Sequence, residues 1–238
     1  MIVKTEAICL KNTRFGESSI VSKMFSLKDG LSSYMVQGVH RKSNTIRPSH
    51  LTPGNILEMV IYEKPNASMQ RIKEVKTLAP LYEIHSDMKK NAVLQFILEI
   101  VAKTNEEMHP DEMIYRFLKD TLLRMESGST NPACMPIYFL RDYLKFTGWY
   151  PDPDLWKKGF VFEMQEGVFG SDTDPVNRNK LEPEMSELVY RVLVADSEDE
   201  LIYQNRKKLL KTFVEYYDIH LLKGKKIQSP EVLSVILS

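Results

Sequence analysis

The sequence predicts an α+β fold, with a five-stranded β-barrel at the N-terminus and a mainly α-helical domain behind it that carries a small β-hairpin. In residues 1–80, apolar and polar side chains alternate in short runs divided by turn signals. From Pro80 onward, apolar residues recur every three or four positions. A long polar connection, residues 40–50, separates the third run from the fourth. Five short runs with this connection suit an OB-like barrel better than a sandwich of seven or more strands.

Turn residues delimit the five expected strands. The first stops at Arg14-Phe15-Gly16-Glu17, and the second stops at Lys28-Asp29-Gly30, where Asp-Gly is a strong hairpin signal. Pro53-Gly54 marks another turn before the fourth. The strands are therefore expected at about residues 3–13, 19–27, 31–39, 55–63 and 69–78. We place the boundary between an OB-fold domain, 1–79, and the helical domain, 80–238, directly after them.

Helical spacing predicts the remaining elements. One helix carries Ala92, Phe96 and Ile100, with Asp87 near its N-terminus, and the next begins after Pro110 with acidic residues in its first turn. Three more helices are expected at about residues 132–146, 183–194 and 198–222. A hairpin is expected at about residues 155–170, between the third helix and the fourth.

Charge is distributed unevenly although the formal net charge is zero. Residues 1–80 hold 12 Lys and Arg against 6 Asp and Glu, a balance of +6, which leaves 20 against 26, or −6, in the rest of the chain. Such asymmetry favours contact between the first part and a polyanion. Two cysteines, Cys9 and Cys134, are too few for a disulfide framework and are expected to be buried apolar groups. No long apolar segment or signal peptide is apparent, which favours a cytoplasmic protein without a membrane span.

The strongest binding signal is the basic loop that contains Arg41, Lys42 and Arg47. Closely spaced cations can follow phosphates and release condensed counterions, although a solvated surface loop would have the same composition. Exposed aromatic rings can stack on bases, and Tyr34 and Phe15 are candidates for this role or for the core. We expect the DNA-binding surface to include Arg14, Lys23, Tyr34, Arg41, Lys42, Arg47, Arg71 and Lys73.

A second basic cluster lies in the acidic part of the chain. It comprises Arg206, Lys207, Lys208 and Lys211, and it either contacts a second DNA strand or forms a solvated helix face. Another group joins cations to apolar residues in the expected helix 132–146, where Arg141 and Lys145 are four residues apart and share a face. Its apolar members are Ile137, Leu140 and Leu144.

Several short motifs, in order along the chain, resemble the RecO family of bacterial recombination mediators. They are Arg14-Phe15-Gly16-Glu17-Ser18-Ser19, Val36-Gln37-Gly38-Val39-His40-Arg41-Lys42-Ser43, Arg71-Ile72-Lys73-Glu74, Phe139-Leu140-Arg141-Asp142-Tyr143-Leu144 with Gly148-Trp149, and Phe162-Glu163 followed by Gly167 and Phe169. Each motif is weak alone, but together they span most of the chain. Many family members carry four cysteines resembling a zinc site around the hairpin, whereas residues 155–170 contain none here. Zinc is therefore not predicted, and apolar packing by Leu155, Trp156, Phe160, Phe162 and Phe169 is expected to hold the hairpin.

The resemblance implies a DNA repair and recombination factor associated with the nucleoid. It would bind single- and double-stranded DNA, anneal complementary strands and, with RecR and single-stranded DNA-binding protein, assist RecA loading. In this family a pocket of the helical domain receives the acidic, phenylalanine-ended tail of single-stranded DNA-binding protein. Ile137, Leu140, Arg141, Leu144 and Lys145 combine apolar and cationic groups that suit such a tail, although an ordinary helix boundary would look the same.

Enzyme chemistry finds little support in the sequence. The five histidines have no metal-ligand spacing, and the chain has neither a nucleophile elbow nor a Gly-rich phosphate loop. Asp172 and Asp174 suggest a metal-dependent hydrolase only remotely, because such pairs before a proline usually form an exposed turn. We therefore expect a non-enzyme that needs no cofactor. The alternative is a protein-interaction adaptor whose OB-like domain binds no nucleic acid.

Overall fold

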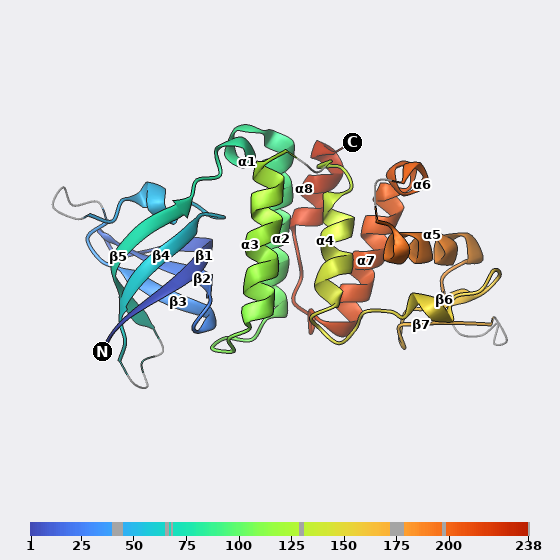
Figure 1. The fold of residues 1–238 in the computed structure, drawn as a ribbon, viewed down its shortest axis with the longest axis horizontal. Coiled ribbons are helices and arrows are strands. Elements are labelled where there is room, and N and C mark those ends of the chain that lie inside the picture. The colour runs from blue at the N-terminus through green and yellow to red at the C-terminus, as the bar shows by residue number, and fades with distance from the viewer. Residues whose placement is uncertain are drawn as a thin grey trace. The chain divides into compact units, whose positions relative to one another are not determined.

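The structure is a computed structural model that describes residues 1–39, 45–64, 67, 69–128, 131–171, 179–196 and 199–237. The chain divides into two compact units, Met1–Thr130 and Asn131–Ser238. The first contains the barrel and three helices, and the second contains the hairpin and the remaining helices (Figure 1). The expected boundary at residue 79 falls at the end of the barrel strands, within the first unit.

Five strands form the barrel: β1 Ile2–Phe15, β2 Ser19–Ser26, β3 Gly30–Val36, β4 Ile56–Tyr62 and β5 Gln70–Ala79. Their order is β1-β2-β3-β5-β4, and β4 also pairs with β1, so the sheet closes on itself. All neighbours are antiparallel except β3 and β5, which pair in parallel. A short 3-10 helix, η1 Pro48–Leu51, precedes β4. The predicted five-stranded OB-like sheet is confirmed.

Alternation along the strands decides which side chains fill the barrel. Tyr34 and Val36 of β3 point inward, whereas Met35 between them points outward. The same period of two applies to Ile61 and Ile72, which face each other across β4 and β5. The inner cluster comprises Ala7, Ile20, Met24, Tyr34, Val36, Val39, Ile46, Leu51, Leu57, Met59, Ile61 and Ile72. The core is therefore continuous from strand to strand and includes residues from the connection before η1.

The helices of the first unit are α1 Tyr82–Ser86, α2 Met88–Thr104 and α3 Glu112–Glu126. Asp87 caps α2, because its carboxylate accepts hydrogen bonds from the backbone N–H of Lys89 (2.7 Å) and Lys90 (2.9 Å). Asp111 caps α3 by accepting from the N–H of Ile114. Both starts agree with the acidic residues that mark them in the sequence, whereas the single turn of α1 was not predicted.

A polar contact fixes α3 to the barrel. The carboxylate of Glu6, on β1, accepts hydrogen bonds from the Tyr115 hydroxyl (2.9 Å) and from Lys119 Nζ (2.7 Å). The hydrogen bond from Lys119 lowers the pKa of Glu6 below its ordinary value, against the opposing effect of burial. This carboxylate therefore joins strand and helix in its ionised form.

The second unit contains α4 Met135–Leu144, η2 Pro153–Leu155, strands β6 Val161–Glu163 and β7 Val168–Gly170, and the helices α5 Pro183–Val194, α6 Glu200–Gln204, α7 Arg206–His220 and α8 Ser229–Ile236. The hairpin of β6 and β7 confirms the prediction of a two-stranded insertion. Phe162 and Phe169 are buried with their ring centroids 4.9 Å apart, and the Phe162 N–H donates to Ser186 Oγ of α5. Trp156 stacks on Tyr190.

One expected helix of this unit was wrong, and one residue contributes less packing than expected. The side chain of Leu155 is exposed, so it packs the hairpin less than the buried Phe162 and Phe169 do. The single helix expected over residues 198–222 is instead broken at Asn205, which ends α6 and precedes α7. Apolar spacing continues through the break, so periodicity gave no warning of it. Asn205 ends α6 by donating from its backbone N–H and its side-chain amide to the Leu201 carbonyl. The short α8 was also not predicted.

No helix within the described residues is long and apolar enough to cross a membrane. Among the same residues, no group of three or more His, Cys, Asp or Glu side chains is arranged to hold a metal ion. Cys9 and Cys134 are both buried free thiols, as expected.

Candidate nucleic-acid interface

One end of the barrel's outer face is covered by the segment between α2 and α3. Phe25 and Leu31 are cross-strand partners that point outward, yet both are almost completely buried. The N–H of Met108 donates to the Leu31 carbonyl at 2.9 Å, which holds the covering segment against β3. This end of the outer face is therefore closed to a ligand.

The other end of the outer face is open and crosses all five strands. Here Val21 pairs with Met35, Met35 with Arg71, Arg71 with Tyr62, and Tyr62 with Ile2. We call these five residues the outer row. Arg71, Tyr62 and Ile2 are exposed, and Val21 and Met35 are half-buried. The row places a cation and an aromatic ring on adjacent strands, with apolar side chains on either side of them.

Arg71 is the cation of this row. No acidic side chain within the described residues forms a salt bridge with it, whereas Lys23 pairs with Glu107 at 2.9 Å and Lys73 pairs with Glu74 at 2.8 Å. Glu74 raises the pKa of Lys73. A phosphate therefore does not have to displace a carboxylate in order to bind the guanidinium of Arg71.

The predicted basic residues divide among different surfaces. Lys23 of β2 and Arg71 of β5 both point outward, from the two strands that pair with β3. Lys73 is exposed at the irregularity where β5 shifts register against β4. Arg14 is exposed, but it lies on the opposite face of β1 from Phe15. Arg47 is exposed directly before η1.

The remaining cations of the predicted DNA-binding set, Arg41 and Lys42, lie outside the described residues, as do Asp172 and Asp174.

Tyr34 is a correction to the predicted site. Its ring is completely buried in the barrel core, and its hydroxyl lies 2.9 Å from both Ser26 Oγ and Asp29 Oδ2. Burial raises the pKa of Tyr34 well above its ordinary value. Of the two roles considered for this ring, the structure shows the core role, because no base can reach it. Phe15, by contrast, is 56% exposed.

Tyr62 is the residue of this face that sequence reasoning missed. It ends β4, directly after the fully buried Ile61, and its side chain is 38% exposed. The alternation of β4 was the available signal, since Leu57, Met59 and Ile61 all belong to the core and place Tyr62 on the outside.

The second predicted basic cluster lies on α7, but its four cations differ in exposure and in hydrogen bonding. Arg206 donates hydrogen bonds to the carbonyls of Tyr203 (3.0 Å) and Leu237 (3.2 Å), so its guanidinium holds the chain ends of α6 and α8. Lys207, Lys208 and Lys211 are exposed, and Lys211 Nζ lies 3.8 Å from the carboxylate of Glu215. Lys207 and Lys211 are four residues apart and share one side of the helix.

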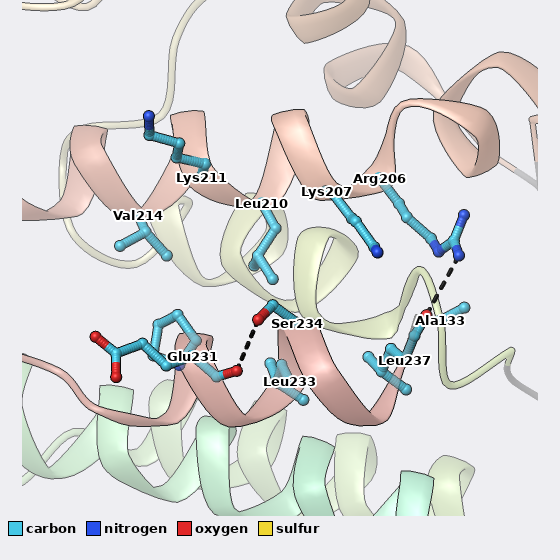
Figure 2. Close-up of a pocket in the computed structure, with 11 residues that line it drawn as sticks. Ala133, Arg206, Lys207, Leu210, Lys211, Val214, Glu231, Leu233, Ser234 and Leu237 are labelled. Atoms are coloured by element: carbon cyan, nitrogen blue, oxygen red, sulfur yellow. Dashed lines mark hydrogen bonds between the residues drawn. The ribbon is translucent and has the colours of Figure 1, made fainter.

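That side of α7 borders a groove of about 340 Å³ between α7 and α8. Figure 2 shows Leu210 and Val214 of α7 on the side of the groove across from Leu233 and Leu237 of α8. Lys207 points toward α8, whereas Lys211 points away from it, and Glu231 lies on α8. The groove thus combines an apolar floor with the exposed ammonium group of Lys207. Sequence reasoning missed it because α8 was not predicted.

The predicted partner-tail pocket on α4 is not open. Ile137, Leu140 and Leu144 have no exposed surface, so they belong to the core of the second unit. Arg141 donates to the carbonyls of Val192 (3.0 Å) and Ala195 (2.7 Å) at the end of α5. Lys145 is half exposed and pairs with Asp142. Arg141 therefore satisfies the backbone carbonyls at the end of α5, and the predicted α4 residues do not line a docking site.

The fold defines the chain as one of the proteins in which an N-terminal OB-like barrel precedes a helical part. Two family models match it: "Recombination protein O N terminal" over residues 1–81 and "Recombination protein O C terminal" over residues 85–155. Similar proteins bear the name DNA repair protein RecO. One from Flavobacterium psychrophilum is 31% identical over 241 residues, covering 100% of both chains. One from Flavobacterium johnsoniae is 27% identical with 100% of both chains covered, and one from Bacteroides fragilis is 24% identical with 98% covered.

The chain belongs to the recombination protein O family. It is therefore a protein of DNA repair and recombination.

Proposed function

We propose that the protein binds single- and double-stranded DNA through the open end of the barrel's outer face and promotes the annealing of complementary strands. The observation that carries this proposal is Arg71, an exposed guanidinium without a described acidic partner in a row that crosses the sheet. Phosphate binding by such groups releases counterions and leaves base edges free to pair. Annealing needs no covalent chemistry, only neutralisation of two polyanions.

The test is fluorescence anisotropy of labelled single- and double-stranded oligonucleotides over a salt series. We expect Arg71→Gln to weaken binding and to reduce the slope of log affinity against log salt by about one, because one phosphate contact is lost. Lys4→Gln is the matched control, since Lys4 is an exposed β1 cation already paired with Glu58 at 2.8 Å. If Arg71→Gln and Lys4→Gln behave alike, DNA does not contact the outer row.

The basic loop is tested separately with a variant carrying Arg41→Ala, Lys42→Ala and Arg47→Ala. A reduced salt slope in this variant would add the loop to the DNA-binding surface. If the wild type binds no oligonucleotide even at low salt, the protein-interaction adaptor is the better interpretation. An adaptor would also keep its protein partners after the loop charges are removed.

For the protein partners, we propose that RecR and single-stranded DNA-binding protein act with this chain to assist RecA loading. The groove between α7 and α8 replaces the α4 residues as the place for the acidic, phenylalanine-ended tail. Its apolar floor suits the ring, and Lys207, which points toward α8, suits a carboxylate, with Lys211 as a further cation on the same helix. The three exposed lysines of α7 also remain a candidate second DNA site.

Charge reversal separates these roles of α7. Lys207→Glu and Lys211→Glu should weaken binding of a tail peptide, whereas Lys208→Glu, on the same helix but outside the groove lining, should not. A DNA contact through the helix would instead weaken oligonucleotide binding in all three variants. Equal loss of peptide binding in all three would mean that only the general charge of α7 matters and would remove the groove from the proposal.

A further inference from the structure

We propose that Tyr62 stacks on a nucleobase of single-stranded DNA while Arg71, its partner on the adjacent strand, binds a neighbouring phosphate. This inference rests on the proposed DNA binding and adds the chemical group that would distinguish a single strand from a duplex. In a duplex the faces of the bases are already stacked, whereas a single strand can place a base on a protein ring.

Tyr62 has the exposure that such a contact requires. In β4, Met59 and Ile61 have no exposed surface, and Tyr62 follows them with 38% of its side chain exposed. The ring takes part in none of the aromatic stacks found among the described residues. The side chain of Tyr62 is thus partly open to solvent and without a described ring partner at the open end of the outer face.

The charges around Tyr62 complement a polynucleotide. Arg71 is its direct cross-strand partner, and such partners have Cβ atoms about 5 Å apart. Lys73 lies close enough that the phenol is among the groups that raise the pKa of this lysine, after Glu74. A ring beside the guanidinium of Arg71, with Lys73 nearby in its pair with Glu74, fits the alternation of base and phosphate along a single strand.

Apolar side chains continue the surface on both sides. Ile2 pairs with Tyr62 on the β1 side, and Met35 follows Arg71 on the β3 side. On β1, Thr13 pairs with Val21 of the outer row, and Phe15, two residues further along the same strand, is 56% exposed.

The experiment compares two oligonucleotides of the same charge, an oligothymidine of about 16 nucleotides and its abasic counterpart. The full-length wild type, Tyr62→Phe and Tyr62→Leu are titrated against both by fluorescence anisotropy at one salt concentration. We expect Tyr62→Leu to lose about 5- to 100-fold in affinity for oligothymidine and nothing for the abasic strand. Tyr62→Phe, which keeps the ring, should bind both strands as the wild type does. Circular dichroism establishes that the variants are folded.

Other outcomes overturn the inference in distinguishable ways. If the wild type binds oligothymidine and Tyr62→Leu binds it equally well, the stacking role is wrong while the proposed DNA binding stands. If Tyr62→Leu loses affinity equally for both strands, the ring supports the surface and does not stack. If the wild type binds neither strand, the proposed function itself has failed, and the inference fails with it.

Discussion

At the scale of single residues, Gly30 shows how closely the first unit is packed. It begins β3 with φ +63°, and a Cβ atom on it would collide with the backbone carbonyl of His109. Gly16 has nearly the same conformation, φ +67°, but has nothing near its Cβ position. The two glycines therefore separate the cost of a left-handed backbone from the cost of a collision.

We expect Gly16→Ala to destabilise the protein by about 1 kcal/mol, the conformational cost alone. Gly30→Ala should cost about 3 kcal/mol or more, because the covering segment must also move away from β3. Chemical denaturation of both variants measures the difference. If both variants lose the same free energy of unfolding, the segment at His109 moves away from β3 without a measurable cost.

Residue-scale roles were the least predictable from the sequence. Tyr34 and Tyr62 are both strand tyrosines near basic residues, yet one fills the barrel and the other is exposed. Which of the alternating positions in each strand faces the barrel interior decides between these roles, and it is known only once the pairing register is known. Arg141 was equally ambiguous, because the carbonyls that it binds lie about 50 positions away in the chain.

At the scale of elements, Glu6 makes the contact between β1 and α3 sensitive to pH. Its pKa is lowered in the folded protein, chiefly by the hydrogen bond from Lys119, so its stabilising effect is present above the unfolded pKa of about 4.5. The contribution is lost as the pH falls through the lower folded value. Glu6 and Lys119 are each about a third exposed, so solvent screening keeps the effect modest.

Glu6→Gln should therefore reduce the free energy of unfolding by about 1 kcal/mol at pH 7. The difference from the wild type should shrink as the pH falls from about 4.5 through the lower folded pKa of Glu6, because the wild-type carboxylate then becomes protonated as well. Denaturant titrations at several pH values measure it. A difference that does not change with pH would show that the negative charge of Glu6 is not what stabilises the contact.

Arg141 links two helices of the second unit, since its guanidinium satisfies carbonyls at the end of α5. Arg141→Met should cost about 3 kcal/mol and should speed amide exchange around residues 191–196. Lys145→Met is the matched control, four residues along the same helix and half exposed, and should change stability by less than about 0.5 kcal/mol. Unchanged exchange near α5 in Arg141→Met would contradict the capping role.

Regular elements could be predicted where one pattern dominates. The five strands were found within a few residues because alternation and turn residues agree along the barrel. The break between α6 and α7 was missed since neither proline nor glycine marks it, and Asn205 acts through a hydrogen bond that apolar spacing cannot reveal. The short helices α1 and α8 contain too few turns for a periodic pattern to stand out.

At the scale of the whole molecule, the barrel strands and the first three helices belong to one compact unit. Phe25 and Leu31 on the outer face are buried, although they point away from the barrel interior. The boundary expected at residue 79 would separate the strands from the segment that covers this face. The sequence could not show this, because alternation distinguishes inside from outside but does not tell which outside positions are covered.

A fragment of residues 1–128 should therefore unfold cooperatively, whereas a fragment of residues 1–79 should expose apolar surface and bind a hydrophobic dye. Thermal unfolding and dye fluorescence of the two fragments make the comparison. If the shorter fragment is equally stable and binds no dye, the barrel is an autonomous domain and the helices contribute little to it.

The seam between β3 and β5 gives the barrel a place to open. Among the residues that the structure describes, two pairs join these strands, Tyr34 with Gln70 and Met35 with Arg71, whereas every other junction is much longer. Thermal opening of the sheet should start here, and its amides should exchange fastest. A strand of DNA lying along the outer row would cross this seam and hold β3 and β5 together. Binding of DNA should therefore slow amide exchange at the β3–β5 junction.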